Sequence, residues 1–295
     1  MLVFALLIGF FLSRIMTRRI SRLITGIEEL QAGEYSTRVK VSGRDELATL
    51  AMAFNDLTER LESTDAVRKR FVSDASHELK TPLASIKLLT DSIVQNESMD
   101  VETVREFVQD IGTEADRLTR ITERLLALTR MDNGYVAPRT AVDLSDVMTD
   151  ALHMLIPLAE QKSVQIHLEL AEDCIVCSSV DEIYQVLFNL VENAIKYNVQ
   201  GGRIWIRTQR QVTAVRVEIE DTGIGIPEED QAKIFDRFYR VDKARSRQAG
   251  GTGLGLSIVR DTVIVNGGSI SVRSRSQGGT CFTVLLPLLR EEEAQ

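Results

Sequence analysis

The pattern of hydrophobic and polar positions divides this chain into stretches of different character, and the first is an apolar run. Residues 1–12 are uncharged and apolar, and residues 13–16 extend the run with Arg14 as the only charge. A helix needs about 20 apolar residues to cross a ~30 Å hydrocarbon core. Four arginines stand between positions 14 and 22, and basic residues mark the cytoplasmic side of a membrane helix. We therefore predict that residues 1–16 are the end of a transmembrane helix that begins upstream. A buried or interfacial amphipathic segment is the alternative.

Two short helices with narrow apolar stripes follow this run. Their apolar residues recur with the alternating three-and-four spacing of a coiled-coil seam, over residues 20–30 and again over residues 47–61. A connector separates them, and the acidic pair Asp45-Glu46 suits the start of the second helix. Because a short helix cannot bury such a stripe alone, we predict a unit at residues 17–66 that pairs with another copy of the chain.

The helical pattern then resumes and turns back once, which predicts a long helical hairpin at residues 67–134. The first arm runs to about residue 95, and the second runs from residue 101 to an Asn-Gly stop at 133–134. Pro82 lies inside the first arm. Because proline lacks an amide hydrogen and its ring clashes with the preceding turn, we expect a bend there.

From residue 139 onward, helices alternate with strands that follow one another closely. This order favours a two-layer α/β sandwich at residues 139–290 over a doubly wound parallel sheet. We predict helices near 144–161, 180–196, 229–235 and 254–266, and strands near 164–170, 174–177, 203–209, 212–220, 269–275 and 280–286. The predicted fold is therefore multidomain, with a helical coiled coil and hairpin followed by an α/β sandwich.

Composition narrows the function classes. The 295 residues include 35 Lys+Arg and 43 Asp+Glu, and the net charge of −8 argues against a general nucleic-acid binder. The three cysteines offer no disulfide framework and fit a reducing compartment. Cys174 and Cys177 form a CxxC pair on a predicted strand, where residues three apart point to opposite faces. Since no second pair exists for zinc, we interpret them as packing residues.

The first group with a chemical pattern lies in the first arm of the hairpin. On a helix, His77 and Thr81 share a face, and Glu78 lies beside the histidine. A zinc-protease HExxH pattern is excluded because position 81 is not a histidine. A neutral imidazole is a nucleophile, and a neighbouring carboxylate can hold one ring N–H so that the other nitrogen presents its lone pair. His77 is therefore a candidate phosphoryl acceptor, although a surface histidine explains these residues alone equally well.

The second group lies on the helix predicted at residues 180–196. Asn189 and Asn193 share one face with Lys196 or Tyr197. Amide oxygens can ligate a hard cation such as Mg²⁺, and an ammonium group can meet phosphate. For any one of these residues, a polar solvent-facing stripe remains the alternative.

Two glycine-rich segments come next. In Asp221-Thr-Gly223-Ile-Gly225 the glycines permit close backbone approach, and the carboxylate can accept a hydrogen bond from an exocyclic amino group such as that of adenine. In Gly251-Thr-Gly253-Leu-Gly255 the segment opens a helix whose N–H groups can hold phosphate. It matches neither the Rossmann fingerprint nor a Walker loop. Between the two segments, aromatic residues precede a cationic stretch with Arg240, Lys243, Arg245 and Arg247 that can close over phosphates.

In this order, the segments resemble the H, N, G1, F, G2 and G3 boxes of membrane sensor histidine kinases. The matching stretches are HELKTP at 77–82, NLVENAIKY at 189–197, DTGIGI at 221–226, FDRFYR at 235–240, GTGLGL at 251–256 and GGT at 278–280. Residues 17–66 resemble a HAMP signal-relay domain, and a generic coiled-coil stalk is the alternative. The resemblance implies that the hairpin forms a dimeric four-helix bundle that carries two ATP-binding sandwich domains.

The resemblance also implies a role for each site residue. By resemblance His77 is the phosphoacceptor, Glu78 is its acid–base partner, and Thr81 positions water for dephosphorylation. Asn193 resembles the Mg²⁺ ligand with Asn189 in support, and Asp221 resembles the adenine reader. The other nucleotide contacts that it implies are Lys196, Tyr197, Gly223, Gly225, Phe235, Phe238, Arg240, Gly251, Thr252, Gly253, Leu254, Gly255, Leu256 and Thr280.

The implied activity is that of a two-component signal transducer. ATP and Mg²⁺ serve autophosphorylation of His77, and the phosphoryl group passes to an aspartate in the receiver domain of a response regulator, toward which phosphatase activity is also expected. The implied partners are that regulator, a second copy of the chain and the cytoplasmic membrane, with the kinase body in the cytoplasm and no direct nucleic-acid contact. Two other classes stay open: a non-catalytic nucleotide-binding scaffold, and an ATP-driven conformational clamp that does not need His77.

Overall fold

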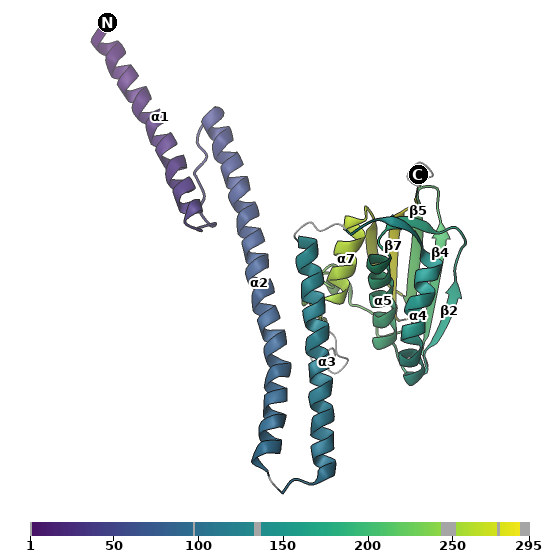
Figure 1. Cartoon of the computed structure of the whole chain (residues 1–295). Coiled ribbons are helices and arrows are strands. Elements are labelled where there is room, and N and C mark those ends of the chain that lie inside the picture. The colour runs from purple at the N-terminus through teal and green to yellow at the C-terminus, as the bar shows by residue number, and fades with distance from the viewer. Residues whose placement is uncertain (1, 97, 133–136, 243–251, 276–277, 290–295) are drawn as a thin grey trace. The chain divides into compact units, whose positions relative to one another are not determined.

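The computed structural model describes residues 2–96, 98–132, 137–242, 252–275 and 278–289 (Figure 1). The chain divides into two compact units, residues 1–74 and residues 75–295. One helix, α2 (Glu46–Gln95), contributes to both units, so the predicted boundary between residues 66 and 67 falls inside a continuous helix. The two units are described separately below.

The N-terminal unit contains α1 (Leu2–Gln31), a connector and the first part of α2. Its small apolar cluster joins Leu23 of α1 and Phe54 of α2 through Val39 of the connector. The Asn55 side chain holds the same connector residue, because it accepts a hydrogen bond from the Val39 amide (2.8 Å) and donates one to the Val39 carbonyl (2.9 Å). Within the described part of the chain, no helix combines the length and apolar character needed to cross a membrane.

The second unit begins with the helical hairpin, whose arms are the end of α2 and α3 (Val101–Asp132). The turn into α3 is fixed locally, since the Asp100 carboxylate accepts hydrogen bonds from the amide (2.9 Å) and the hydroxyl (2.7 Å) of Thr103. These bonds lower the pKa of Asp100. The first arm continues as a helix through Pro82. The predicted stop at residues 133–134 lies outside the described residues.

The α/β part has a mixed five-stranded sheet in the order β2-β4-β5-β7-β6, with β2 parallel to β4 and the other neighbours antiparallel. A separate antiparallel pair joins β1 and β3. The strands are β1 (Thr140–Asp143), β2 (Gln165–Glu169), β3 (Ile175–Ser178), β4 (Arg203–Arg210), β5 (Ala214–Asp221), β6 (Ser269–Ser274) and β7 (Thr280–Pro287), and the helices are α4 (Leu144–Gln161), α5 (Val180–Lys196) and α7 (Gly255–Val265).

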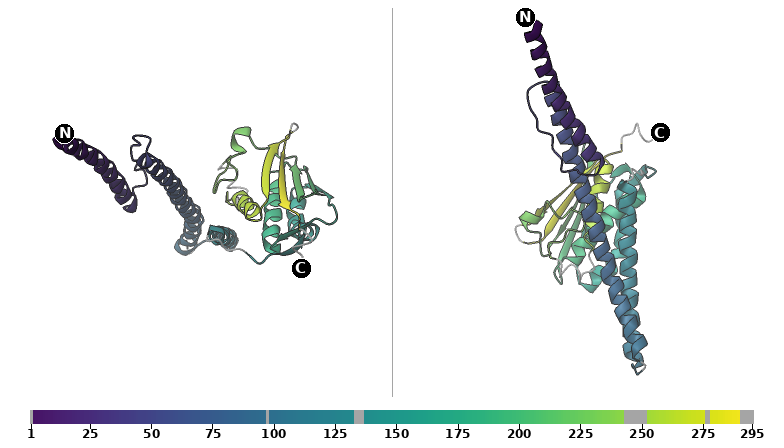
Figure 2. Two further views of the ribbon diagram at one scale, coloured as in Figure 1. Left: turned by 90° about the horizontal axis from the view of Figure 1, so that it is seen from above. Right: turned by 90° about the vertical axis from the view of Figure 1, so that its left-hand side faces the viewer.

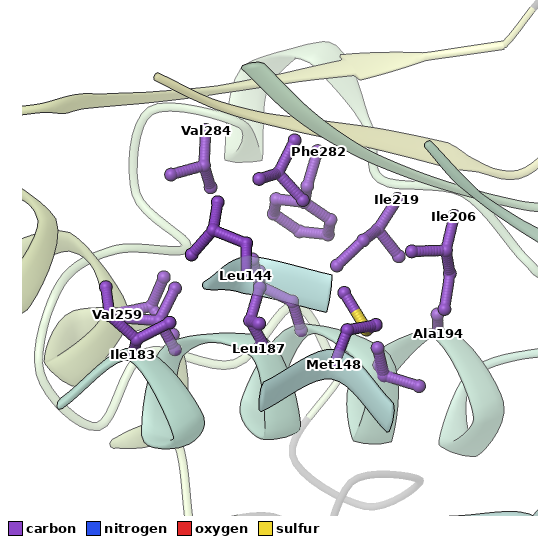
Figure 3. Close-up of a cluster of buried hydrophobic side chains, with 14 of the residues drawn as sticks. Leu144, Met148, Ile183, Leu187, Ala194, Ile206, Ile219, Val259, Phe282 and Val284 are labelled. Carbon is purple, nitrogen blue, oxygen red and sulfur yellow. The ribbon is translucent and has the colours of Figure 1, made fainter. Parts of the chain in front are cut away.

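The three helices cover one face of the sheet, as Figures 1 and 2 show. The period-two pattern of the strands explains this arrangement: Val215, Val217 and Ile219 of β5 are buried, and the charged residues between them face the other way. Figure 3 shows the resulting core, in which Leu187 of α5 and Phe282 of β7 meet between helices and sheet. The prediction of helical segments followed by an α/β two-layer sandwich is confirmed.

Two element predictions were wrong or incomplete. The helix predicted near residues 229–235 is a short 3₁₀ helix, η1 (Glu228–Asp230), followed by turns. The backbone bonds of η1 span three residues, as from the Asp230 amide to the Pro227 carbonyl (3.0 Å). The adjacent side chains of Ile234 and Phe235 are both buried, which a turn accommodates more readily than a surface helix. Strand β1 was missed because its four residues show no clear alternation.

Candidate functional site

A cavity of about 350 Å³ lies in the second unit, between α5, the segment that follows β5 and the N-terminus of α7. It brings together most of the residues for which a nucleotide contact was predicted. Those that line it are Asn189, Asn193, Lys196, Tyr197, Asp221, Gly225, Arg240, Thr252, Gly253, Gly255, Leu256 and Thr280. Segments far apart in the sequence therefore meet at one place.

Four predicted residues stand behind the cavity wall instead. Leu254 is fully buried, and Phe235 packs edge-on against Phe282 with ring centroids 6.5 Å apart. Phe238 has a positive φ of 63° and donates its amide to the Gly253 carbonyl (2.9 Å). These residues and Gly223 support the wall rather than line it. Gly251, Lys243, Arg245 and Arg247 lie outside the described residues.

Asp221, the last residue of β5, is 5% exposed at the inner end of the cavity. Its Oδ1 accepts hydrogen bonds from the amides of Gly223 (2.7 Å) and Thr280 (3.2 Å). Burial raises the pKa of Asp221 to about 6, although these two amides and the nearby Arg275 favour the ionised form. A buried carboxylate with its pKa raised by desolvation, in a cavity, is typical of a ligand-binding position.

The backbone around Asp221 is packed so closely that only glycine fits at two positions. A Cβ on Gly223 would lie 2.3 Å from the Tyr197 carbonyl oxygen. A Cβ on Gly279, whose φ is +95°, would lie 2.0 Å from the Asp221 carbonyl oxygen. The glycines thus let the end of α5 and the start of β7 close around the carboxylate.

The polar face of α5 forms the wall where a cation can bind. Asn189 is buried and donates its amide nitrogen to the Gln185 carbonyl (2.7 Å), so its position is fixed. Asn193, one turn later, lines the cavity, and Lys196 pairs with Glu192 at 2.8 Å. Carboxamide oxygens suit Mg²⁺, which keeps several waters and takes phosphate oxygens as further ligands. These donors therefore fit a Mg²⁺–phosphate group.

The N-terminus of α7 faces the same cavity. Gly253, with a φ of +72°, and Gly255, where the helix begins, both line the cavity, and the first N–H groups of a helix are suited to hold an anion. Gly255 also lies close to α5, because a Cβ there would be 2.9 Å from Asn189 Oδ1. Glycine is needed for this approach of the two helices.

The hairpin contributes contacts to the cavity that the sequence did not predict. Arg240, whose side chain is 5% exposed, donates to Glu78 of α2 at 2.9 Å. On α3, Arg124 lines the cavity and donates to the Thr252 hydroxyl (2.8 Å), and it also lies 3.4 Å from a Glu192 oxygen. No motif marked Arg124, and the only signal was a basic residue on the polar side of a helix.

The predicted phosphoacceptor group has a local geometry of its own. His77 and Thr81 lie one turn apart on α2, and the Thr81 hydroxyl donates to the His77 carbonyl at 3.2 Å. Neither residue lines the cavity. Glu78 is the member of this group that the structure brings into contact with a cavity residue, Arg240.

Comparison with known proteins gives three family matches. The models match the HAMP domain at residues 11–63, the His Kinase A (phospho-acceptor) domain at residues 67–134, and the histidine kinase-, DNA gyrase B- and HSP90-like ATPase at residues 178–290. Together they extend over most of the chain.

Curated relatives match over nearly the full chain. The signal transduction histidine-protein kinase BaeS of Escherichia coli is 33% identical over 97% of this chain and 61% of its own length. The sensor histidine kinase YclK of Bacillus subtilis is 32% identical over 99% of this chain and 63% of its own length. The chain therefore spans about three fifths of the length of these relatives.

Among solved structures, the histidine kinase ThkA, crystallised with the response regulator TrrA, has the same fold. It aligns with a TM-score of 0.60 over 78% of this chain and 66% of its own, at 24% sequence identity.

Proposed function

Because this chain belongs to the sensor histidine kinase family, we propose that it binds ATP in the cavity and transfers the γ-phosphoryl group to His77. The observation that carries the proposal is the cavity itself. It joins the buried Asp221, the polar face of α5 and the N-terminus of α7, and its Arg240 contacts the residue next to His77. We further propose the division into residues 1–16, 17–66, 67–134 and 139–290 as functional segments.

In the proposed site, each group has a defined task. The ionised Asp221 accepts from the adenine amino group, and Lys196 and Arg240 meet the phosphates. The N–H groups at the start of α7 hold the same phosphates. Asn193, supported by Asn189, would hold Mg²⁺, which neutralises phosphate charge when bound. Positioning and charge neutralisation therefore account for most of the catalysis, as in other phosphoryl transfers.

The proposed transfer is an in-line displacement at the γ-phosphorus. A lone pair of the His77 ring forms the N–P bond while the bond to the bridging oxygen breaks and ADP leaves. The other ring nitrogen then carries a proton that Glu78 can accept. The contact of Glu78 with Arg240 fits this role, because it ties the base to a residue of the nucleotide cavity.

Incubation of the 295-residue chain with γ-labelled ATP and Mg²⁺ tests this function. We expect an acid-labile, alkali-stable label on the wild-type protein and none on His77→Gln. The matched control is His153→Gln, which changes an exposed histidine on α4 and should keep the label. Nucleotide binding without a label on the wild-type protein would support a scaffold instead, and a label that survives in His77→Gln would place the acceptor elsewhere.

We propose that the phosphoryl group then passes to an aspartate in the receiver domain of a response regulator. The ThkA structure, which has this fold, contains a response regulator and supports this choice of partner. We also propose that Thr81, on the same face as His77, positions water for the reverse task of dephosphorylating that partner. Thr81→Ala should slow dephosphorylation about a hundredfold, the lower end of the range for loss of one catalytic group, while sparing His77 labelling. Equal loss of both activities would refute the assignment.

Membrane attachment is the last part of the proposal. The first turns of α1 expose large apolar side chains, such as Phe4, Phe10 and Phe11, each at least 66% accessible. We propose that they lie in the cytoplasmic membrane, with the kinase body on the cytoplasmic side. Flotation with phospholipid vesicles is the test: the full chain should float, and a chain that lacks residues 2–12 should remain at the bottom of the gradient.

A further inference from the structure

A surface cluster on the open face of the sheet lies directly behind Asp221. Its centre is Arg275, which follows β6 and is 22% exposed at its side chain. The guanidinium lies 2.5 Å from a Glu220 oxygen and 5.2 Å from the centre of the Trp205 ring. Cross-strand pairing of Trp205 with Glu220 places both partners side by side on that face.

The same guanidinium reaches the backbone of the adenine-reading residue. Arg275 Nη1 donates to the Asp221 carbonyl at 3.0 Å. The Arg275 amide also donates to the Gly279 carbonyl (3.1 Å), and the next residue, Thr280, donates its amide to the Asp221 carboxylate. Arg275 therefore holds Asp221 in two ways. Its guanidinium bonds the backbone oxygen of Asp221, and its amide holds the segment whose next residue, Thr280, donates to the Asp221 carboxylate.

A fork-shaped side chain is suited to this position. One guanidinium can bond a carboxylate and a carbonyl at the same time and stack on an aromatic ring, whereas an ammonium is a single point charge. The charged groups that act on Asp221 are Arg275 and Glu220, which are of opposite sign. Since Arg275 also neutralises Glu220, it removes part of the repulsion that an ionised Asp221 would feel.

We propose that Arg275 is a positioning residue for adenine recognition, which holds Asp221 from the solvent side of the sheet so that its ionised carboxylate faces the cavity. The inference rests on the proposed function, because it assumes that Asp221 accepts from the adenine amino group. It adds to the proposed function a residue that influences which nucleotide is preferred without contacting the nucleotide itself. No motif in the sequence includes Arg275.

The test compares ATP with inosine triphosphate, which carries an oxo group where adenine has its amino group. Inosine triphosphate also carries a proton on N1, where adenine has a lone pair, and both ligands have the same phosphates, so the ratio of their dissociation constants reports how the base edge toward Asp221 is recognised at each pH. The ratio is measured by calorimetry on the full chain with Mg²⁺ between pH 5.5 and pH 8. We expect the wild-type chain to prefer ATP and to lose this preference as the pH falls.

Without Arg275 we expect the pKa of Asp221 to rise by about one unit from about 6, which lowers its ionised fraction at pH 7 from about nine tenths to about one half. Arg275→Gln should therefore reduce the preference for ATP about twofold at pH 7 and about fivefold at pH 6. It should also move the loss of preference to higher pH. Arg275→Lys keeps the charge, so the pH at which preference is lost should return toward the wild-type value while part of the preference stays lost. The matched control is Arg273→Gln, which removes an arginine that is 65% exposed and lies 3.6 Å from Glu218. It should leave the ratio unchanged.

Each outcome decides a separate question. If the wild-type chain binds no ATP, the proposed function fails. If it prefers ATP and Arg275→Gln has the same ratio and the same pH profile, the inference about Arg275 is wrong. Equal weakening of both ligands, with no recovery in Arg275→Lys, would show a merely structural role and would overturn it as well. Should Arg275→Gln fail to fold by circular dichroism, Arg275→Lys decides, and an unchanged ATP preference there would contradict the proposal.

Discussion

At the scale of single residues, Asp221 shows how the fold can disfavour the ionised form of a carboxyl group. Its burial disfavours the anion, and the amides of Gly223 and Thr280 only partly offset this, so its pKa rises to about 6. A ligand that donates a hydrogen bond can recover the lost solvation. Asp221 thus costs folding stability in the free protein and can gain a hydrogen bond when a ligand binds, a combination that is common at functional sites.

The raised pKa of Asp221 predicts a pH-dependent stability difference for Asp221→Asn. Because the carboxyl titrates near 3.8 when unfolded and near 6 when folded, it contributes stability at low pH that is lost as the pH rises through this window. Asparagine keeps an acceptor for the two amides and cannot ionise. The variant should therefore be more stable than wild type above pH 6, by at most about 3 kcal/mol, and the gap should close toward pH 4. Urea unfolding at several pH values measures it, and a gap that stays constant or widens as the pH falls would contradict the assignment.

Sequence reasoning predicted cavity residues whose spacing is local and did not predict those that reach the cavity or Asp221 through tertiary contacts. Asp221 and Asn193 were predicted because a strand end and a helical face can be read from neighbouring positions. Arg124 and Arg275 were missed, because each acts through a residue distant in the chain: Thr252 lies 128 positions from Arg124, and Asp221 lies 54 positions from Arg275. The raised pKa of Asp221 was also beyond prediction, since it depends on burial.

At the scale of elements, α7 has a glycine at its start and another just after its end, and glycine is required at the two positions for different reasons. Gly255 begins the helix, where a Cβ would press on Asn189 Oδ1 at 2.9 Å. Gly267 follows its end with a φ of +72°, and a Cβ there would make only an ordinary contact, 3.5 Å from Pro287. The first glycine serves the site, whereas the second serves the chain reversal.

Alanine should therefore affect a different property at each glycine: ATP affinity at Gly255 and folding stability at Gly267. Gly255→Ala should displace the Asn189 amide and weaken Mg²⁺-ATP binding about tenfold, which corresponds to about 1.4 kcal/mol, with little change in melting temperature. Gly267→Ala should destabilise the chain by about 1–2 kcal/mol through backbone strain and keep the ATP affinity. Calorimetric titration and thermal unfolding of both variants provide the comparison. Reversed or identical effects would show that the approach of α7 to α5 does not shape the site.

Elements with a strong period were predictable, and weakly patterned ones were not. The predicted ranges of α4 and α5 match the structure, since each has a wide apolar face over four or more turns. The segment at residues 229–235 has two adjacent buried side chains and no helical repeat, and there the prediction of a helix was wrong. The backbone conformation of this segment depends on how Ile234 and Phe235 pack against the core, which local sequence does not reveal.

At the scale of the whole molecule, the hairpin arms leave an apolar surface uncovered in the single chain. Leu83, Leu88 and Val94 of α2 and Val108 of α3 are each 56% or more exposed. Leu83 and Val94 are eleven positions apart, about three helical turns, so they lie on the same side of α2, and an exposed apolar side of a helix marks an interaction surface. A second copy of the hairpin is the partner expected from the family, since two such hairpins bury these faces in a four-helix bundle. The helical period predicted the hairpin, but it did not predict the contact of Arg240 with Glu78, 162 positions away.

This surface predicts that the full chain is a homodimer and that Leu83→Asp weakens it. A carboxylate at a buried dimer position would lose its hydration without a partner, so the dimer should dissociate at concentrations about a hundredfold higher than for wild type, the effect of about 2.7 kcal/mol. Sedimentation velocity measures the change from the mass of two chains to the mass of one. Val212→Asp is the matched control, because Val212 is 96% exposed in the turn between β4 and β5, where an added charge should not affect association. A wild-type monomer, or a Leu83→Asp dimer as tight as wild type, would mean that this face of the hairpin is not the contact between copies.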